Sequence, residues 1–114
     1  MNEKELEDIR QDLLERRENL QRRIKEENDK VNENKSENLD PADLAQDYNF
    51  RQRISSIVDR YELEIVEINN ALRRIEEGSF GTCENCGATI PIERLRAMPQ
   101  AKLCIRCQTE HRVV

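Results

Sequence analysis

The sequence predicts a mainly α-helical protein, in which an antiparallel coiled-coil hairpin is followed by a small module that contains four cysteines. The first observation is that apolar residues on either side of Leu39 are spaced as near mirror images. Leu6 and Leu72, Leu13 and Ile65, Leu20 and Val58, and Ile24 and Ile54 each lie at equal distances from it. The second is that all four cysteines belong to two CxxC pairs near the C-terminus. We therefore expect a hairpin over residues 1–77, with its tip at 36–45, and a separate module over residues 78–114.

Two helices, over residues 3–35 and 43–77, are expected to form the hairpin. In the second helix apolar residues recur at alternating steps of four and three, which is typical of a coiled coil. These residues are Ile54, Val58, Tyr61, Ile65, Ile68, Leu72 and Ile75. The first helix is less regular, because Arg10, Arg17 and Glu27 interrupt its apolar face. It therefore needs the second helix as a partner.

The same apolar seam could instead form a coiled coil between two chains. Pro41 and the polar residues 32–38 argue against this, because they break any continuous helix where the mirror spacing places a turn. The prediction is an elongated monomer with an intramolecular hairpin. It also places Tyr48 on the seam, near the start of the second helix.

The expected tip carries two aspartates and a proline. Asp40 followed by Pro41 is typical of a helix N-cap and a first helical residue, since proline lacks only an N–H that the helix does not use there. Asp43 then falls in the first turn, where a carboxylate suits the positive end of the helix dipole. Both aspartates therefore have two interpretations. Either they serve only to start the helix, or the tip also carries their charge to a partner.

Composition disfavours several classes of protein. Charged residues make up 38% of the 114 residues and aromatic residues 4%, which argues against a sizeable globular core. The net charge of −5 argues against broad binding to nucleic acid or to anionic membranes. The sequence shows neither a signal peptide nor an apolar run long enough to span a bilayer, so we expect a cytoplasmic protein.

The two cysteine pairs predict a metal site. Cys83 and Cys86 form one CxxC pair and Cys104 and Cys107 the other, with 17 residues between the pairs. This spacing is typical of a tetrahedral zinc site, and a redox-active dithiol is the alternative. Four thiolate ligands leave zinc no position for water, so the ion would be structural and not catalytic. Zinc would also stabilise a module that is too small to fold by burial alone.

Together these motifs resemble the DksA/TraR family of zinc-finger transcription regulators. The matching residues of the module are Phe80, Gly81, the four cysteines, Gly87, Ile90, Arg94, Leu95, Ala97, Pro99 and Leu103. Residues 40–45 (DPADLA) look like the DxxDxA tip motif of the family, at the expected distance before the cysteines. The resemblance implies a coiled-coil hairpin, a four-cysteine zinc module and a short C-terminal helix.

The resemblance also implies a function. A protein of this family would bind bacterial RNA polymerase directly, would not read DNA sequence, and would regulate transcription initiation without being an enzyme, as in the stringent response. Its coiled coil would enter the secondary channel, where the tip residues Asp40, Asp43 and Ala45 would approach the catalytic centre. Two alternatives stay open. One is a Gre-like factor whose tip carboxylates help to hold Mg²⁺ for transcript cleavage, and the other is a zinc-ribbon adaptor unrelated to polymerase.

Some members of the family use basic side chains to help bind ppGpp at the polymerase interface. The corresponding positions here are Glu67, Met98 and Gln108, and none of them is basic. The sequence therefore predicts a weak or absent response to ppGpp.

Overall fold

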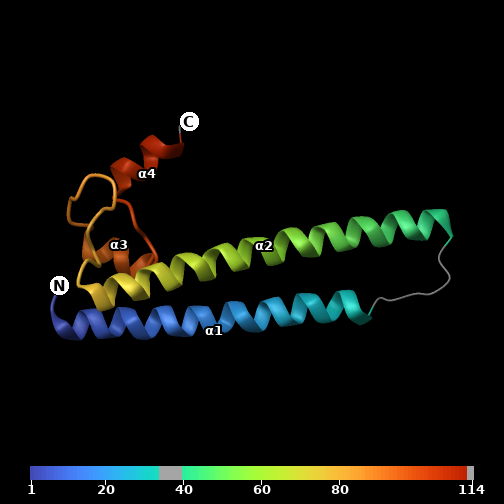
Figure 1. Ribbon diagram of the computed structural model, residues 1–114, viewed down its shortest axis with the longest axis horizontal. Coiled ribbons are helices and arrows are strands. Elements are labelled where there is room, and N and C mark those ends of the chain that lie inside the picture. Colours follow the sequence, from blue (N-terminus) through green and yellow to red (C-terminus); the bar gives the residue numbers. More distant parts are fainter. Residues whose placement is uncertain (34–39, 113–114) are drawn as a thin grey trace. The chain divides into compact units, whose positions relative to one another are not determined.

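Four α-helices make up most of the chain in the computed structural model, which describes residues 1–33 and 40–112 (Figure 1). They are α1 (Glu3–Glu33), α2 (Pro41–Glu77), α3 (Ile92–Ala97) and α4 (Ile105–Arg112). The described residues form no strand, and only an isolated antiparallel bridge joins Thr82 to Thr89. The predicted fold class is confirmed, including the short C-terminal helix. Residues 36–39 of the predicted tip lie outside the described residues.

Both long helices begin with a side-chain cap. Asn2 and Glu5 form a reciprocal capping box at the start of α1, in which the Glu5 N–H donates to Asn2 Oδ1 at 2.7 Å and the Asn2 N–H donates to Glu5 Oε1 at 3.2 Å. At the start of α2 the Asp43 N–H donates to Asp40 Oδ1 at 2.9 Å. The prediction that Asp40 is an N-cap, with Pro41 as the first helical residue, is therefore confirmed.

A glycine ends α2. Gly78 has a φ of +81°, the left-handed conformation that favours glycine. The Ser79 N–H donates to the Arg74 carbonyl at 2.9 Å, and the Gly78 N–H donates to the Ile75 carbonyl at 3.3 Å. This pair of bonds is a Schellman motif, which satisfies carbonyl groups that the end of a helix leaves unpaired.

The chain divides into two compact units, which group residues differently from the predicted domains. One unit contains residues 1–16 and 66–114, and the other contains residues 17–65. Each unit therefore includes a part of α1 and a part of α2, and within each the two helices run antiparallel (Figure 1). The division into a hairpin domain over residues 1–77 and a module over residues 78–114 stays a prediction from the sequence.

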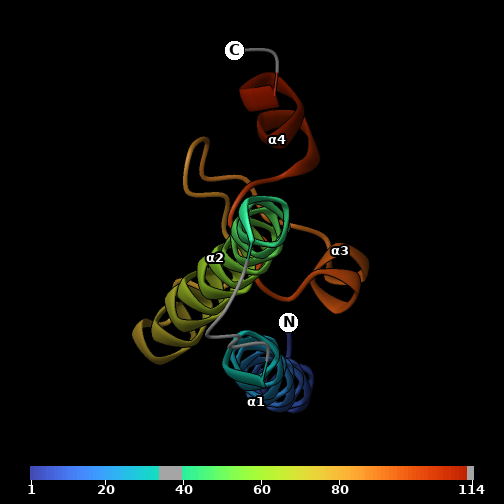
Figure 2. The ribbon, with the colours of Figure 1, turned by 90° about the vertical axis from the view of Figure 1, so that its right-hand side faces the viewer.

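The first unit holds the larger share of the buried apolar side chains. These are Ile9, Leu13, Ile68, Ala71, Ile90, Leu95, Pro99 and Ala101, from α1, α2, α3 and the segments around α3. Gly81 packs closely here, since a Cβ at this position would lie 3.2 Å from Met1 Cε and 3.6 Å from Leu95 Cδ1. Figures 1 and 2 show α4 on the opposite side of α2 from α1.

The second unit corrects two details of the predicted seam. Tyr48 is 63% exposed and does not lie on the seam. Val31 lines one surface depression with residues of α2 that include Ile54 and Val58. A register centred on Leu39 would instead place Asp47 opposite Val31. The residues of α2 around this depression therefore lie further along the helix than the mirror spacing predicts, and a displacement by whole turns keeps the same helix faces together.

Glu27 of α1 shows why the pattern on this helix was irregular. Its side chain is only 15% exposed and forms an ion pair with Lys30 at 3.1 Å, while its second carboxylate oxygen is buried and has no hydrogen-bond partner. A carboxylate thus occupies a position where the coiled-coil pattern predicts an apolar side chain. Among the described residues, no helix is long and apolar enough to cross a membrane.

Candidate metal centre

The four cysteines come together in the first unit. All four sulfur atoms lie within 4.8 Å of one another, and the Sγ atoms of Cys86 and Cys104 are 3.8 Å apart. None of the four forms a disulfide. Zinc–sulfur bonds of ~2.3 Å in a tetrahedron place the sulfurs about 3.8 Å apart, so the cluster has the size that a zinc ion requires.

The first cysteine pair lies on a tight turn. The Cys83 N–H donates to the Ala88 carbonyl at 2.8 Å, and the Gly87 N–H donates to the Cys83 carbonyl at 3.0 Å. Gly87 has a φ of +76°, which closes the turn at little conformational cost. Cys83 is buried by this turn, whereas Cys86 is exposed.

The second pair lies at the start of α4. The Gln108 N–H donates to the Cys104 carbonyl at 2.9 Å, so Cys104 begins the helix and Cys107 occupies its first turn, where it is buried. Two contacts tie this segment to the first pair. The Glu84 N–H donates to the Lys102 carbonyl at 2.9 Å, and Asn85 Nδ2 lies 3.4 Å from Cys107 Sγ.

The surroundings shift the pKa values of Cys83 and Cys107 in opposite directions. A hydrogen bond from the backbone of Cys104, supported by one from the backbone of Cys86, lowers the pKa of Cys83 to about 6. For Cys107, the hydrogen bond from Asn85 lowers the pKa, but burial and the three neighbouring thiols together raise it to about 12. Zinc would displace the thiol protons, because a thiolate and not a thiol is the ligand.

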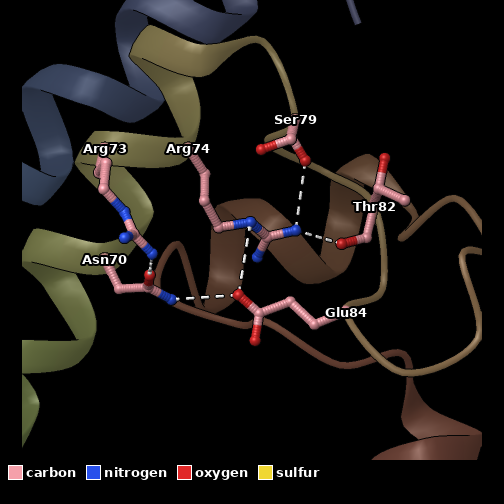
Figure 3. A network of polar contacts seen from close by, with 6 residues as sticks. All are labelled: Asn70, Arg73, Arg74, Ser79, Thr82 and Glu84. Atoms are coloured by element: carbon pink, nitrogen blue, oxygen red, sulfur yellow. Dashed lines mark hydrogen bonds and ion pairs between the residues drawn. The ribbon is translucent and has the colours of Figure 1, made fainter.

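Arginines outside the cluster hold the segments that carry the cysteines. Arg94 of α3 donates from Nε to the Leu103 carbonyl at 3.3 Å, one residue before Cys104. Arg74 of α2 reaches the residues on either side of Cys83, as Figure 3 shows. No sequence pattern distinguishes Arg74, since it stands beside Arg73 and resembles one more charge on an exposed helix face.

The predicted tip residues belong to the second unit and are all exposed. Asp40, Asp43 and Ala45 lie at the cap and in the first turns of α2, and Leu44 and Tyr48 are exposed apolar neighbours. Of the positions compared with the ppGpp site, Glu67 and Gln108 line one surface depression of the first unit, whereas Met98 is not part of that lining. The other residues around the depression are Glu84, Asn85, Lys102 and Leu103.

Comparison with known proteins identifies the family. Residues 78–112 match the prokaryotic dksA/traR C4-type zinc finger. Over 111 residues the chain is 34% identical to the RNA polymerase-binding transcription factor DksA of Caulobacter vibrioides. The aligned residues make up 97% of this chain and 78% of that protein. It is 42% identical to DksA of Escherichia coli over 71 residues, 61% of this chain and 46% of that one.

A solved structure shares the fold. Transcription factor DksA2 from Pseudomonas aeruginosa superimposes with a TM-score of 0.85 at 32% sequence identity, over 98% of this chain and 86% of that one. Its similarity extends across both helices and the cysteine segment and is not limited to the zinc finger. The chain therefore belongs to the DksA/TraR family of C4-type zinc-finger proteins, and its four-cysteine cluster is the site of one structural zinc ion.

Proposed function

We propose that this protein binds RNA polymerase directly and regulates transcription. The observation that carries the proposal is the similarity along 97% of the chain to a protein named as an RNA polymerase-binding transcription factor. A match confined to the zinc finger would support only a shared metal site. Here the relatedness includes the helical hairpin, which is the part expected to act on the polymerase.

In this proposal the start of α2 enters the secondary channel and approaches the catalytic centre. Asp40, Asp43 and Ala45 are exposed, as contact with a partner requires. The cap bond of Asp40 uses its Oδ1, and the charge of the carboxylate remains available. Ala45 presents a small side chain, which would allow close approach.

The zinc centre has a structural role in this function. Its four sulfur ligands leave no open coordination position, so it offers no site for a metal-bound water or substrate. We assign the protein no enzymatic activity of its own and no reading of DNA sequence. Its net charge of −5 agrees with a protein partner better than with a nucleic-acid partner. The proposed partner lies in the cytoplasm, which agrees with the location expected from the sequence.

Two measurements on purified components test the proposal. Equilibrium binding to RNA polymerase should saturate, and transcription in vitro from a set of promoters should change when the protein is added. A Gre-like role would appear instead as shortened transcripts in stalled elongation complexes. Absence of polymerase binding by zinc-loaded protein would contradict the proposal and would favour a zinc-ribbon adaptor.

A further inference from the structure

Arg74 is unusual because it is a charged side chain in a buried place. It lies on the last turns of α2 and is 5% exposed, the only buried charged residue in the part of the chain that the structure describes. Its neighbour Arg73 is exposed and donates to Asn70 Oδ1. A guanidinium withdrawn from water requires several partners, because its charge is otherwise costly to bury.

The partners of Arg74 lie on the segment that leads into the zinc centre (Figure 3). Nη2 donates to the Ser79 carbonyl at 3.2 Å and also to the Thr82 carbonyl. Nε lies 3.7 Å from Glu84 Oε1, which also accepts from Asn70 Nδ2 at 3.2 Å. Thr82 and Glu84 are the residues immediately before and after Cys83. One guanidinium therefore holds both sides of a zinc ligand.

The backbone of Arg74 takes part as well. Its carbonyl accepts the Ser79 N–H at 2.9 Å, while its side chain donates to the Ser79 carbonyl. The turn between α2 and Cys83 is thus fixed at its start by the main chain and at its end by the side chain of the same residue. Arginine suits this task, because its planar guanidinium presents several N–H groups in a fixed geometry that lysine lacks.

We propose that Arg74 is a positioning residue of the zinc centre, which holds Cys83 from α2 in the place where its sulfur meets the other three. The zinc site is then built jointly by its ligands and by the end of a helix outside the module. The relation works in both directions. When zinc is bound, Thr82 and Glu84 stay in place as partners of the buried charge. When zinc leaves, that charge loses them and the last turn of α2 loosens.

The inference is independent of polymerase binding and can be tested on the isolated full chain. Zinc-loaded protein is mixed with the chromogenic chelator 4-(2-pyridylazo)resorcinol, and the rate of zinc transfer is followed. Arg74→Gln should release zinc roughly 10- to 100-fold faster than the parent, the range typical for residues that orient metal ligands. Arg60→Gln is the control, since it makes the same chemical change at an exposed position of α2 outside this network, and its release rate should equal that of the parent.

Two further measurements separate positioning from general stabilisation. Cobalt-substituted Arg74→Gln should show altered d–d absorption bands while its helical circular dichroism stays unchanged. In the parent, removal of zinc should speed hydrogen exchange at the Ser79 amide, and this change should be smaller in Arg74→Gln. Arg74→Lys keeps the positive charge but lacks the planar guanidinium and its fixed N–H groups. It should release zinc at a rate between those of the parent and Arg74→Gln.

The proposal is overturned if Arg74→Gln releases zinc at the rate of the parent and of Arg60→Gln. It is equally overturned if faster release occurs only together with loss of helical signal, because Arg74 would then act through the whole fold. Should Arg74→Gln fail to fold, Arg74→Lys decides. Parent-like zinc release and a parent-like cobalt spectrum in that variant would exclude a positioning role for the guanidinium.

Discussion

At the scale of single residues, Asp40 shows that a capping role and a functional role are compatible. Its Oδ1 accepts a hydrogen bond from the Asp43 N–H, which confirms the cap. Asp40 and Asp43 are nevertheless both exposed. Substitution by asparagine separates the two roles. Asparagine caps a helix about as well as aspartate but carries no charge.

We predict that Asp40→Asn and Asp43→Asn keep the fold and the affinity for RNA polymerase but lose most of the effect on transcription. For Asp43→Asn the expected loss of stability is only the dipole contribution, about 0.3–1 kcal/mol. Circular dichroism, polymerase binding and transcription in vitro on the same preparations provide the measurement. If both variants regulate as well as the parent, the aspartates act only at the start of the helix.

We also predict that ppGpp has little or no effect on this protein's action. Glu67 and Gln108 line one depression without supplying a positive charge there, and the basic residue in that lining is Lys102 alone. A polyphosphate would meet Glu67 and Glu84 and be repelled. Transcription assays with and without ppGpp test this. As the control, Glu67→Lys should increase any response, and strong synergy with the parent protein would refute the prediction.

At the scale of elements, glycines with positive φ shape the path from α2 into the cysteine turn. Gly78 ends the helix and Gly81 lies at a close contact. A Cβ at Gly78 would meet nothing within 4 Å, whereas one at Gly81 would approach Met1 and Leu95. The two positions therefore differ in sterics but not in backbone conformation.

Gly78→Ala should lower the free energy of unfolding by about 1–2 kcal/mol, which is the conformational cost of the left-handed region for a residue with a Cβ. Gly81→Ala should cost at least as much, because a contact with Met1 is added. Chemical denaturation of the zinc-loaded variants measures both. An unchanged midpoint for Gly78→Ala would mean that the helix ends differently in solution.

The order of the cysteine module, residues 78–114, is expected to depend on bound zinc. We predict one zinc ion per chain, detectable by elemental analysis, and loss of module order in Cys83→Ser or Cys107→Ser. Most helical signal should survive, since α1 and α2 contain 31 and 37 residues against 6 and 8 in α3 and α4. Collapse of the whole circular dichroism signal would show that the long helices depend on zinc.

At the scale of the whole molecule, the central question is whether the two long helices pair within one chain. Val31 of α1 and Ile54 and Val58 of α2 line the same depression, which supports pairing within one chain. The loss of apolar regularity at Glu27 would weaken a dimer formed by the same seam as much as it weakens the hairpin.

We predict a monomer. A photo-crosslinking benzoylphenylalanine placed at Val31 should react within its own chain, with the peptide that contains Ile54 and Val58. Sedimentation should give a molecular mass near 13.5 kDa that does not depend on concentration. Crosslinks found only between chains would replace the hairpin with an intermolecular coiled coil.

Several features of this protein followed from local sequence alone. The cap at Asp40, the helix end at Gly78 and the meeting of two CxxC pairs each depend on residues a few positions apart or on fixed ligand chemistry. The antiparallel pairing of α1 and α2 also followed, because a polar segment with a proline interrupts two apolar patterns. These signals require no knowledge of which distant residues touch.

Other features were decided only by tertiary structure. The residues of α2 that share a depression with Val31 lie further along the helix than the mirror spacing predicts. Displacement by whole turns keeps the same faces in contact, so packing had to select one alignment. Tyr48 proved exposed, although its spacing fits the seam. Arg74 became a buried partner of the turn that carries Cys83, whereas Arg73 stayed in solvent. Two adjacent arginines look the same in a sequence, and only the packing around α2 determines which of them meets carbonyl groups and which meets water.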